Sequence, residues 1–281
     1  MASQQAIKHR IGSVRNTKQI TKAMQLVAAS KLRKAQESAL GPKAYVATAK
    51  ELLASLAWHP DAMSNPLFTA PDSPNALTVV ISSDRGLAGA YNTNVLKAAA
   101  TALQTCKGQN YVISVGKYAS RFVARLKNIE SLGAYEQDLI NLDTDIVQPV
   151  LSTMFESFNN GDVSSVTVVY TTFVSTIRQE VVVEQLLPIP KSDVKVSDRE
   201  FEPNAEVVFE KAVKRILEAQ MLQYLLESRA SEQASRMLAM KNATDNASDL
   251  IDDLTLMYNN ARQAKITQEL AEISAGAEAI K

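Results

Sequence analysis

The stretch NATDNASDLIDDLTLMYNNA, residues 242–261, carries apolar or small side chains at steps of four or three residues. The positions are Ala243, Ala247, Ile251, Leu254, Tyr258 and Ala261. This spacing is typical of the seam along which two helices pack in a coiled coil. The stretch therefore predicts a long helix that needs a partner helix.

The C-terminal helix is expected to span residues 203–281, with Asn204 as its N-cap. At about 1.5 Å per residue, such a helix exceeds roughly 100 Å. After Ala261 the spacing takes one step of five and then resumes at Ile266, Leu270, Ile273, Ala277 and Ile280. The seam is therefore expected to shift face near Arg262, where the supercoil should relax.

An N-terminal coiled-coil helix is expected over residues 1–58, because Pro42 is the only proline there. The adjacent Gly41 and Pro42 indicate a kink or a break. A weaker apolar stripe consists of Ile7, Ile11, Val14, Ile20, Met24, Val27 or Ala28, Leu32 and Ala35. We expect the two chain ends to pair antiparallel as one two-stranded shaft.

Between the helices, a linker with four prolines over residues 59–75 leads into an α/β domain over residues 76–190. β-rich runs predict strands at residues 76–83, 110–115, 164–174 and 177–187, the last two as a hairpin. Helices are expected at residues 94–105, 117–127 and 144–158. This alternation favours a mostly parallel sheet. The predicted fold class is α/β: a long antiparallel coiled coil of N- and C-terminal helices plus a Rossmann-like α/β domain.

The charge is distributed unevenly, although 30 basic residues balance 30 acidic ones. Residues 1–43 contain nine Lys or Arg and one acid, Glu37. A solvated helix face would carry acidic partners four residues from its basic residues, and we expect these to be missing. The basic segment, centred on ITKAMQLVAASKLRKAQ at residues 20–36, is therefore predicted to meet an acidic partner.

The composition excludes several kinds of protein. No apolar run reaches the roughly 18 residues of a membrane span, and the first residues lack the features of a signal or transit peptide. We therefore expect a cytosolic chain. One cysteine, Cys106, and two histidines, His9 and His59, predict neither a disulfide nor a metal site, and no cofactor is expected.

The turn SDRGLAGAYN, residues 83–92, follows the first predicted strand, where α/β domains place their ligands. It matches neither the GxGxxG pattern nor the P-loop pattern, so it lacks the groups that hold phosphates. We interpret it as a structural turn in which Asp84 and Arg85 can form a local ion pair. No catalytic Ser/His/Asp set, paired carboxylates or activated cysteine stands out elsewhere. The domain is therefore interpreted as a scaffold rather than an enzyme.

Four stretches occur in this order along the chain: ITKAMQLVAASKLRKAQ, SDRGLAGAYN, ASRMLAMKNATDNA and YNNARQAKITQELAEISAGAEA. Together they resemble the gamma subunit of the F-type rotary ATP synthase, bacterial type. The chain departs from that family at Ala88, where the turn often has a cysteine, and Cys106 alone excludes the thiol switch of the chloroplast type. The resemblance implies the central rotor stalk of a proton-translocating ATP synthase. Such a stalk couples rotation of the membrane c ring to conformational change in the catalytic beta subunits, and is not itself an enzyme.

The resemblance also implies partners: the ring of alpha and beta subunits, the epsilon subunit and the c-subunit ring, at the cytoplasmic face of the bacterial plasma membrane. An acidic lever segment of beta would press on Lys22, Met24, Lys31, Arg33 and Lys34, and on the turn near Arg85 and Ala88. Loops of beta would contact Arg262, Gln263 and Thr267, and an alpha/beta collar would enclose residues 273–281. Phe201 and Glu202 would lie at the foot, near the c ring and epsilon.

The residues leave two other classes of protein open. A nucleic-acid adaptor would use the basic helix on phosphates, but no aromatic residues interleave with its lysines for base stacking. A Rossmann-type enzyme dimerised by its helices would need a nucleotide site. Salt-sensitive nucleic-acid binding would favour the first class, and tight nucleotide binding by the chain would favour the second.

Overall fold

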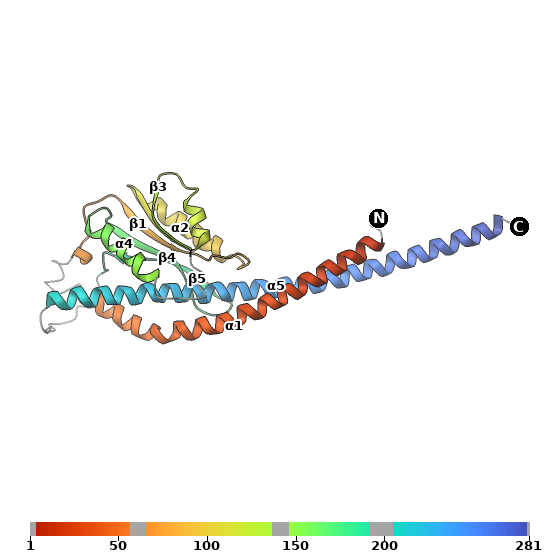
Figure 1. Cartoon of the computed structure of the whole chain (residues 1–281), viewed down its shortest axis with the longest axis horizontal. Coiled ribbons are helices and arrows are strands. Elements are labelled where there is room, and N and C mark those ends of the chain that lie inside the picture. Colours follow the sequence, from red (N-terminus) through yellow and green to blue (C-terminus); the bar gives the residue numbers. More distant parts are fainter. Residues whose placement is uncertain (1–3, 57–65, 137–145, 191–204, 280–281) are drawn as a thin grey trace. The chain divides into compact units, whose positions relative to one another are not determined.

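The computed structural model describes residues 4–56, 66–136, 146–190 and 205–279, apart from the side chains of residues 54–56, 205–210 and 276–279. The chain divides into two compact units, one of residues 1–28 with 237–281 and one of residues 29–236. Two long helices run through both units: α1, Gln4–Leu56, and α5, Ala205–Ala279. They run antiparallel (Figure 1), which confirms the predicted helix pair.

The larger unit contains an α/β domain built on one sheet. After the short helix η2 (Pro66–Phe68), its elements are β1 (Ala76–Ile81), α2 (Tyr91–Thr105), β2 (Asn110–Val115), α3 (Lys117–Val123), β3 (Ile129–Tyr135), α4 (Val147–Asn159), β4 (Ser165–Phe173) and β5 (Gln179–Leu187). The strand order is β3-β2-β1-β4-β5, with β5 antiparallel to β4 and the other pairs parallel. The predicted parallel sheet with one hairpin is confirmed. α2 begins earlier than expected, at Tyr91, and α3 ends earlier, at Val123.

Strand β3 is missing from the prediction. Its sequence, IESLGAY, alternates only weakly and contains Gly133, and all of its residues are exposed or half-buried. It pairs with β2 at the edge of the sheet. Backbone hydrogen bonds to β2 therefore stabilise this strand more than an apolar face does, and its sequence carries little signal.

The sheet is packed on both faces. One face buries Leu77, Val79 and Ile81 of β1 in a cluster with residues of α4 and α5. The other face buries Val80 and Val169 in a cluster with residues of α2 and α3. Figure 1 shows α2 and α4 on opposite sides of the sheet. Because successive residues of a strand point to opposite faces, the central strand β1 is a nearly continuous apolar run.

The seam of α1 differs from the prediction at one position. Ile20 is 61% exposed, whereas its neighbour Thr21 is buried. Strict steps of four and three lead to Thr21 and then to Ala28, so Ile20 lies one residue outside the seam and Val27 is exposed. The hydroxyls of Thr21 and Thr244 share a hydrogen bond of 2.8 Å. A polar residue can occupy the seam because its buried hydroxyl has a partner across it.

Helix α1 runs through the Gly41-Pro42 pair without interruption. Proline removes a backbone hydrogen bond from a helix, so packing must compensate for it. On α5, Gln223 Nε2 donates to Ala39 O at 3.3 Å, and Lys43 Nζ lies 4.0 Å from Glu227 Oε1. Because these contacts hold α1 on both sides of the proline, the alternative of a break is wrong.

The seam of α5 is covered along its first run only. Its members from residue 243 to residue 261 are buried or half-buried, whereas every described side chain from residue 262 to residue 275 is exposed. Ile273, for example, is 69% exposed. The expected second run is therefore not paired with α1, because the described part of α1 begins at Gln4 and its seam is matched by the first run. Ala277 and Ile280 lie outside the residues whose side chains are described.

Candidate partner-binding surface

The turn between β1 and α2 is closed by its own side chains. Asn92 accepts a hydrogen bond from Ser83 N at 3.1 Å and donates one to Ser83 Oγ at 2.8 Å. Ser83 Oγ in turn donates to Arg85 O at 2.8 Å. Asp84 Oδ1 accepts a hydrogen bond from Lys117 N at 3.0 Å, while its pairing with Arg85 stays a prediction. The turn is a hydrogen-bonded structural loop.

The tip of this turn presents Arg85 and Leu87 to solvent. Leu87 is 62% exposed and has a φ of 62°, a conformation that few residues other than glycine adopt. Ala88, by contrast, is 2% exposed and packs in the core cluster that contains Tyr91 and Val95. Its methyl group is buried and offers a partner no surface, whereas the side chains of Arg85 and Leu87 are exposed.

Arg236 of α5 fastens the turn. Its Nη2 donates to Arg85 O at 3.1 Å and to Gly86 O at 3.2 Å, and its Nε donates to Gly86 O at 3.4 Å. Its Nη1 lies 2.6 Å from Glu232 Oε1. Both charged side chains are nearly buried, so each needs the other. The sequence prediction missed Arg236, although a Glu-Arg pair four residues apart in a run of small residues was an available signal.

The basic segment of α1 is mostly exposed. Three of its predicted contact residues are exposed, namely Lys22, Arg33 and Lys34. The other two, Met24 and Lys31, are half-buried. Arg33 Nε lies 3.2 Å from Glu37 Oε1, so the expected lack of acidic partners is wrong for Arg33. Glu37 follows at the four-residue spacing that places both side chains on one helix face. A pair this exposed contributes only about 0–1 kcal/mol, which leaves the arginine available to a partner.

The predicted contact residues of α5, Arg262, Gln263 and Thr267, are all exposed. They follow directly on Ala261, the last half-buried position of the described part of α5. The predicted shift of the seam at Arg262 therefore coincides with the end of the run that α1 covers. From here on, the side chains of α5 are open to a partner on every described face.

The predicted contact residues fall into the two units. The smaller unit holds Lys22, Met24, Arg262, Gln263 and Thr267, and the larger unit holds Lys31, Arg33, Lys34, Arg85 and Ala88. The remaining pair, Phe201 and Glu202, lies outside the described residues.

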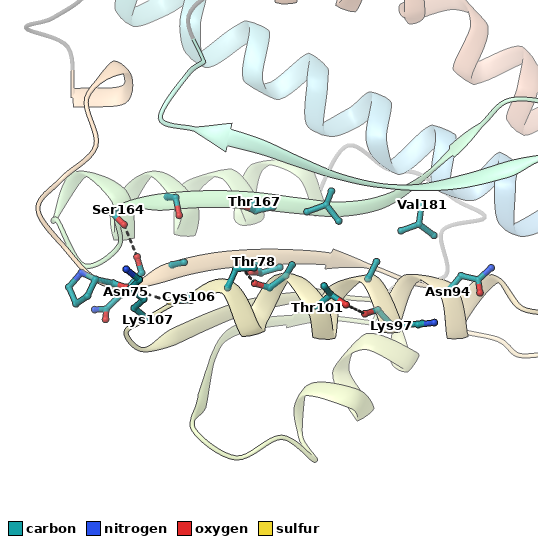
Figure 2. A pocket seen from close by; sticks show the side chains of 17 residues that line it. Asn75, Thr78, Asn94, Lys97, Thr101, Cys106, Lys107, Ser164, Thr167 and Val181 are labelled. Atoms are coloured by element: carbon teal, nitrogen blue, oxygen red, sulfur yellow. Dashed lines mark hydrogen bonds between the residues drawn. The ribbon is translucent and has the colours of Figure 1, made fainter.

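A groove of about 960 Å³ runs along α2 on the domain surface. Figure 2 shows Lys97 and Thr101 of α2 on one side of it and Thr167 of β4 and Val181 of β5 on the other. Its lining consists of small, hydroxyl, amide and aliphatic side chains with two lysines and Cys106, and no described residue of the lining is a histidine or a carboxylate. Such a lining lacks the imidazole and carboxylate groups that act most often as general bases.

Among the described residues, no group of three or more His, Cys, Asp or Glu side chains is placed to hold a metal ion. In the same part of the chain, no helix combines the length and the apolar character needed to cross a membrane.

Fold and surfaces together define a class: an α/β domain on a long antiparallel helix pair whose exposed faces carry basic and polar residues. A family model described as ATP synthase matches residues 3–280. An ATP synthase gamma chain of Actinobacillus pleuropneumoniae serotype 5b (strain L20) is 39% identical over 291 residues and covers 100% of both chains. One of Salinibacter ruber (strain DSM 13855 / M31) is 38% identical over 306 residues, covering 100% of this chain and 99% of that one.

The fold is similar to that of a chain in a cryo-EM structure of the Euglena gracilis mitochondrial ATP synthase, OSCP/F1/c-ring, in rotational state 3. The TM-score is 0.70 at 18% identity, over 99% of this chain and 94% of that one. The chain belongs to the family of ATP synthase gamma chains, the central stalk subunits of the F-type ATP synthase. This membership leaves the nucleic-acid adaptor and the helix-dimerised enzyme without support.

Proposed function

We infer that this chain is the non-catalytic rotor of its ATP synthase. It turns inside a ring of alpha and beta subunits and stands on the c ring, with epsilon beside it, at the cytoplasmic face of the bacterial plasma membrane. The observation that carries this proposal is the open surface of the shaft. Basic and polar residues are exposed on both long helices, from Lys22 to Lys34 and from Arg262 to Thr267.

This surface suits a part that must slide past its partners. Exposed, screened charge contacts contribute about 0–1 kcal/mol each, so none of them locks the rotor at one angle. A shaft made of two different helices presents a different face to each beta subunit. Turning the shaft then changes which conformation each catalytic site favours, because differential contact biases a switch between states.

Apart from the buried Ala88, each predicted contact residue has a proposed partner. Lys22, Met24, Lys31, Arg33 and Lys34 meet an acidic lever segment of beta, together with Arg85 and Leu87 at the tip of the turn. Arg262, Gln263 and Thr267 meet loops of beta, and the exposed stripe that includes Ile273 enters an apolar collar of alpha and beta. Phe201 and Glu202 lie near epsilon and the c ring.

Charge reversal on α1 tests the lever contact. We expect Lys31→Glu, Arg33→Glu and Lys34→Glu together to lower ion pumping per ATP hydrolysed by about threefold to tenfold, because each attraction becomes a repulsion. The matched triple change to Gln should have little effect, because it removes only screened attraction. Pumping and hydrolysis would be measured in complexes reconstituted in vesicles. Equal damage from both triple variants would show that specific hydrogen bonds, rather than charge, make the contact.

A second test addresses the exposed α5 residues. Arg262→Ala with Gln263→Ala should leave assembly intact and slow steady-state ATP hydrolysis by about threefold to fivefold, because a guanidinium fork and an amide that hold a loop of beta are lost. The matched control is Asn259→Ala with Asn260→Ala, two exposed residues of the same helix. Unchanged turnover in the assembled double variant, or an equal loss in the control, would make Arg262 an ordinary solvated residue.

A further inference from the structure

Three hydrogen bonds from one guanidinium group join helix α5 to the turn that carries Arg85 and Leu87. Arg236 reaches two successive carbonyl oxygens, those of Arg85 and Gly86, at 3.1–3.4 Å. The remaining nitrogen, Arg236 Nη1, lies 2.6 Å from Glu232 Oε1. Arg236 is 9% exposed, so water does not compete freely for these bonds. The contact ties the tip of a surface turn to a helix of the shaft.

The turn needs such a fastening. Leu87 holds a positive φ with its side chain in solvent, a conformation that persists only where the surroundings enforce it. The bonds of Asn92 close the base of the turn at Ser83, and the buried Ala88 anchors its far side. At the carbonyls of Arg85 and Gly86, the additional bonds from outside the turn come from Arg236. The guanidinium therefore holds the backbone at Arg85, whose side chain is exposed, and at Gly86, which precedes the exposed Leu87.

We propose that Arg236 is the positioning residue for this turn: it holds the Arg85 and Gly86 carbonyls on α5 so that Arg85 and Leu87 meet the beta subunit at a fixed place on the rotor. The inference rests on the proposed function, because it gives the turn a partner. Rotation of the helix carries the turn with it, and a loosened turn would lag behind the shaft. Because Arg236 is nearly buried within the chain, it acts through the turn.

Only arginine can make this set of bonds. Its planar fork bonds two carbonyls and a carboxylate at once, whereas a lysine ammonium is one point charge on a flexible stem. Arg236→Lys therefore keeps the charge opposite Glu232 and loses the carbonyl geometry. Arg236→Met combined with Glu232→Gln removes both charges without leaving one buried and unpaired. The matched control is Arg215→Lys, which alters an exposed pair with Glu218 on the same helix.

Hydrogen exchange in the full chain tests the fastening itself. The amide hydrogens of Ser83 and Tyr91, which bond to Asn92 Oδ1 and Ala88 O, report on the turn. We expect them to exchange roughly tenfold faster in Arg236→Lys and faster still in the double variant. Global unfolding of Arg236→Lys, read from the slowest-exchanging amides of β1, should become more favourable by no more than the same tenfold factor, because local opening and global unfolding break the same bonds. Arg215→Lys should match the parent throughout. Unchanged exchange at the turn in both Arg236 variants would overturn the proposal.

A double-mutant cycle in the reconstituted complex tests the functional part. Arg236→Lys should lower ion pumping per ATP by about twofold to threefold, and this loss should vanish when Arg85 and Leu87 are both alanine. A residue with a merely structural role would cause the same loss in either background, and that result would overturn the proposal. If the two alanines alone leave coupling unchanged, the contact between the turn and beta is wrong, whereas the fastening is still judged by exchange.

Discussion

In the free chain, the amide hydrogens of residues 266–275 will exchange with solvent at least about a thousandfold faster than those of residues 78–81 in β1. β1 lies between two parallel neighbours and its side chains are buried on both faces. The last described turns of α5, by contrast, have every side chain exposed, including Leu270 and Ile273. A helix without a packed face is marginal in water, so this segment should open without global unfolding.

The same helix supplies the control for this experiment. Residues 247–254, whose seam is buried against α1, should exchange at an intermediate rate. The measurement is hydrogen exchange resolved to short peptides. Protection of residues 266–275 equal to that of β1 would mean that the stripe is already covered in the free chain. The proposed apolar collar would then have no open surface to bind.

At alkaline pH the protein will lose stability steeply, by up to about 4 kcal/mol per pH unit above about pH 10. Three buried tyrosines cause this. Burial, and next Glu232, raises the pKa of Tyr91, and burial, and next Glu184, raises the pKa of Tyr170 and of Tyr224. Tyr170 donates to Glu184 Oε2 at 3.2 Å and stacks on Tyr224 with ring centroids 4.3 Å apart.

The sign of this pH dependence follows from the raised pKa values of the three tyrosines. The unfolded chain releases these three protons near pH 10, whereas the folded chain keeps them to higher pH. The stabilisation is therefore fully present below about pH 10 and is lost as the pH rises towards the folded-state pKa values. Each group contributes a slope of up to about 1.4 kcal/mol per pH unit.

Denaturant unfolding at a series of pH values from about 8 to about 11 would measure the slope. Tyr224→Phe should reduce the slope by about one third, because one titrating group is gone. Tyr45→Phe is the matched control, since Tyr45 is exposed on α1, and it should leave the slope unchanged. Tyrosinate absorbance provides a second reading. Full ionisation of Tyr91, Tyr170 and Tyr224 in the folded chain near pH 10 would contradict the prediction.

Periodicity predicted the two long helices and much of the seam that joins them, but not its extent along α5. The run from Ala243 to Ala261 is buried or half-buried as expected, because a heptad spacing places these positions on one side of any helix. The prediction was wrong at Ile20, because it placed this apolar residue in the seam instead of the neighbouring Thr21. The hydroxyl of Thr21 has its partner, Thr244, on the other helix, and no local pattern shows that.

The site was predicted unevenly for a related reason. Exposure of Arg33, Lys34 and Arg262 follows from a charge on a helix face away from the seam, and it holds. The family resemblance placed Ala88 in a surface that meets beta, yet its side chain is buried in the core. Whether a side chain in a turn faces solvent depends on the backbone conformation at each residue, which composition does not specify.

The sequence alone determined the two long helices, the seam that joins them and the parallel sheet between them. These features depend on residues a few positions apart, and the periodic spacing of apolar side chains indicates which of these residues are buried. Only the tertiary structure decided the edge strand β3, the uncovered end of α5 and the fastening of the turn by Arg236. Arg236 and Arg85 are 151 positions apart in the chain, and their bond exists because packing of the sheet on α5 brings a buried guanidinium to two carbonyl oxygens.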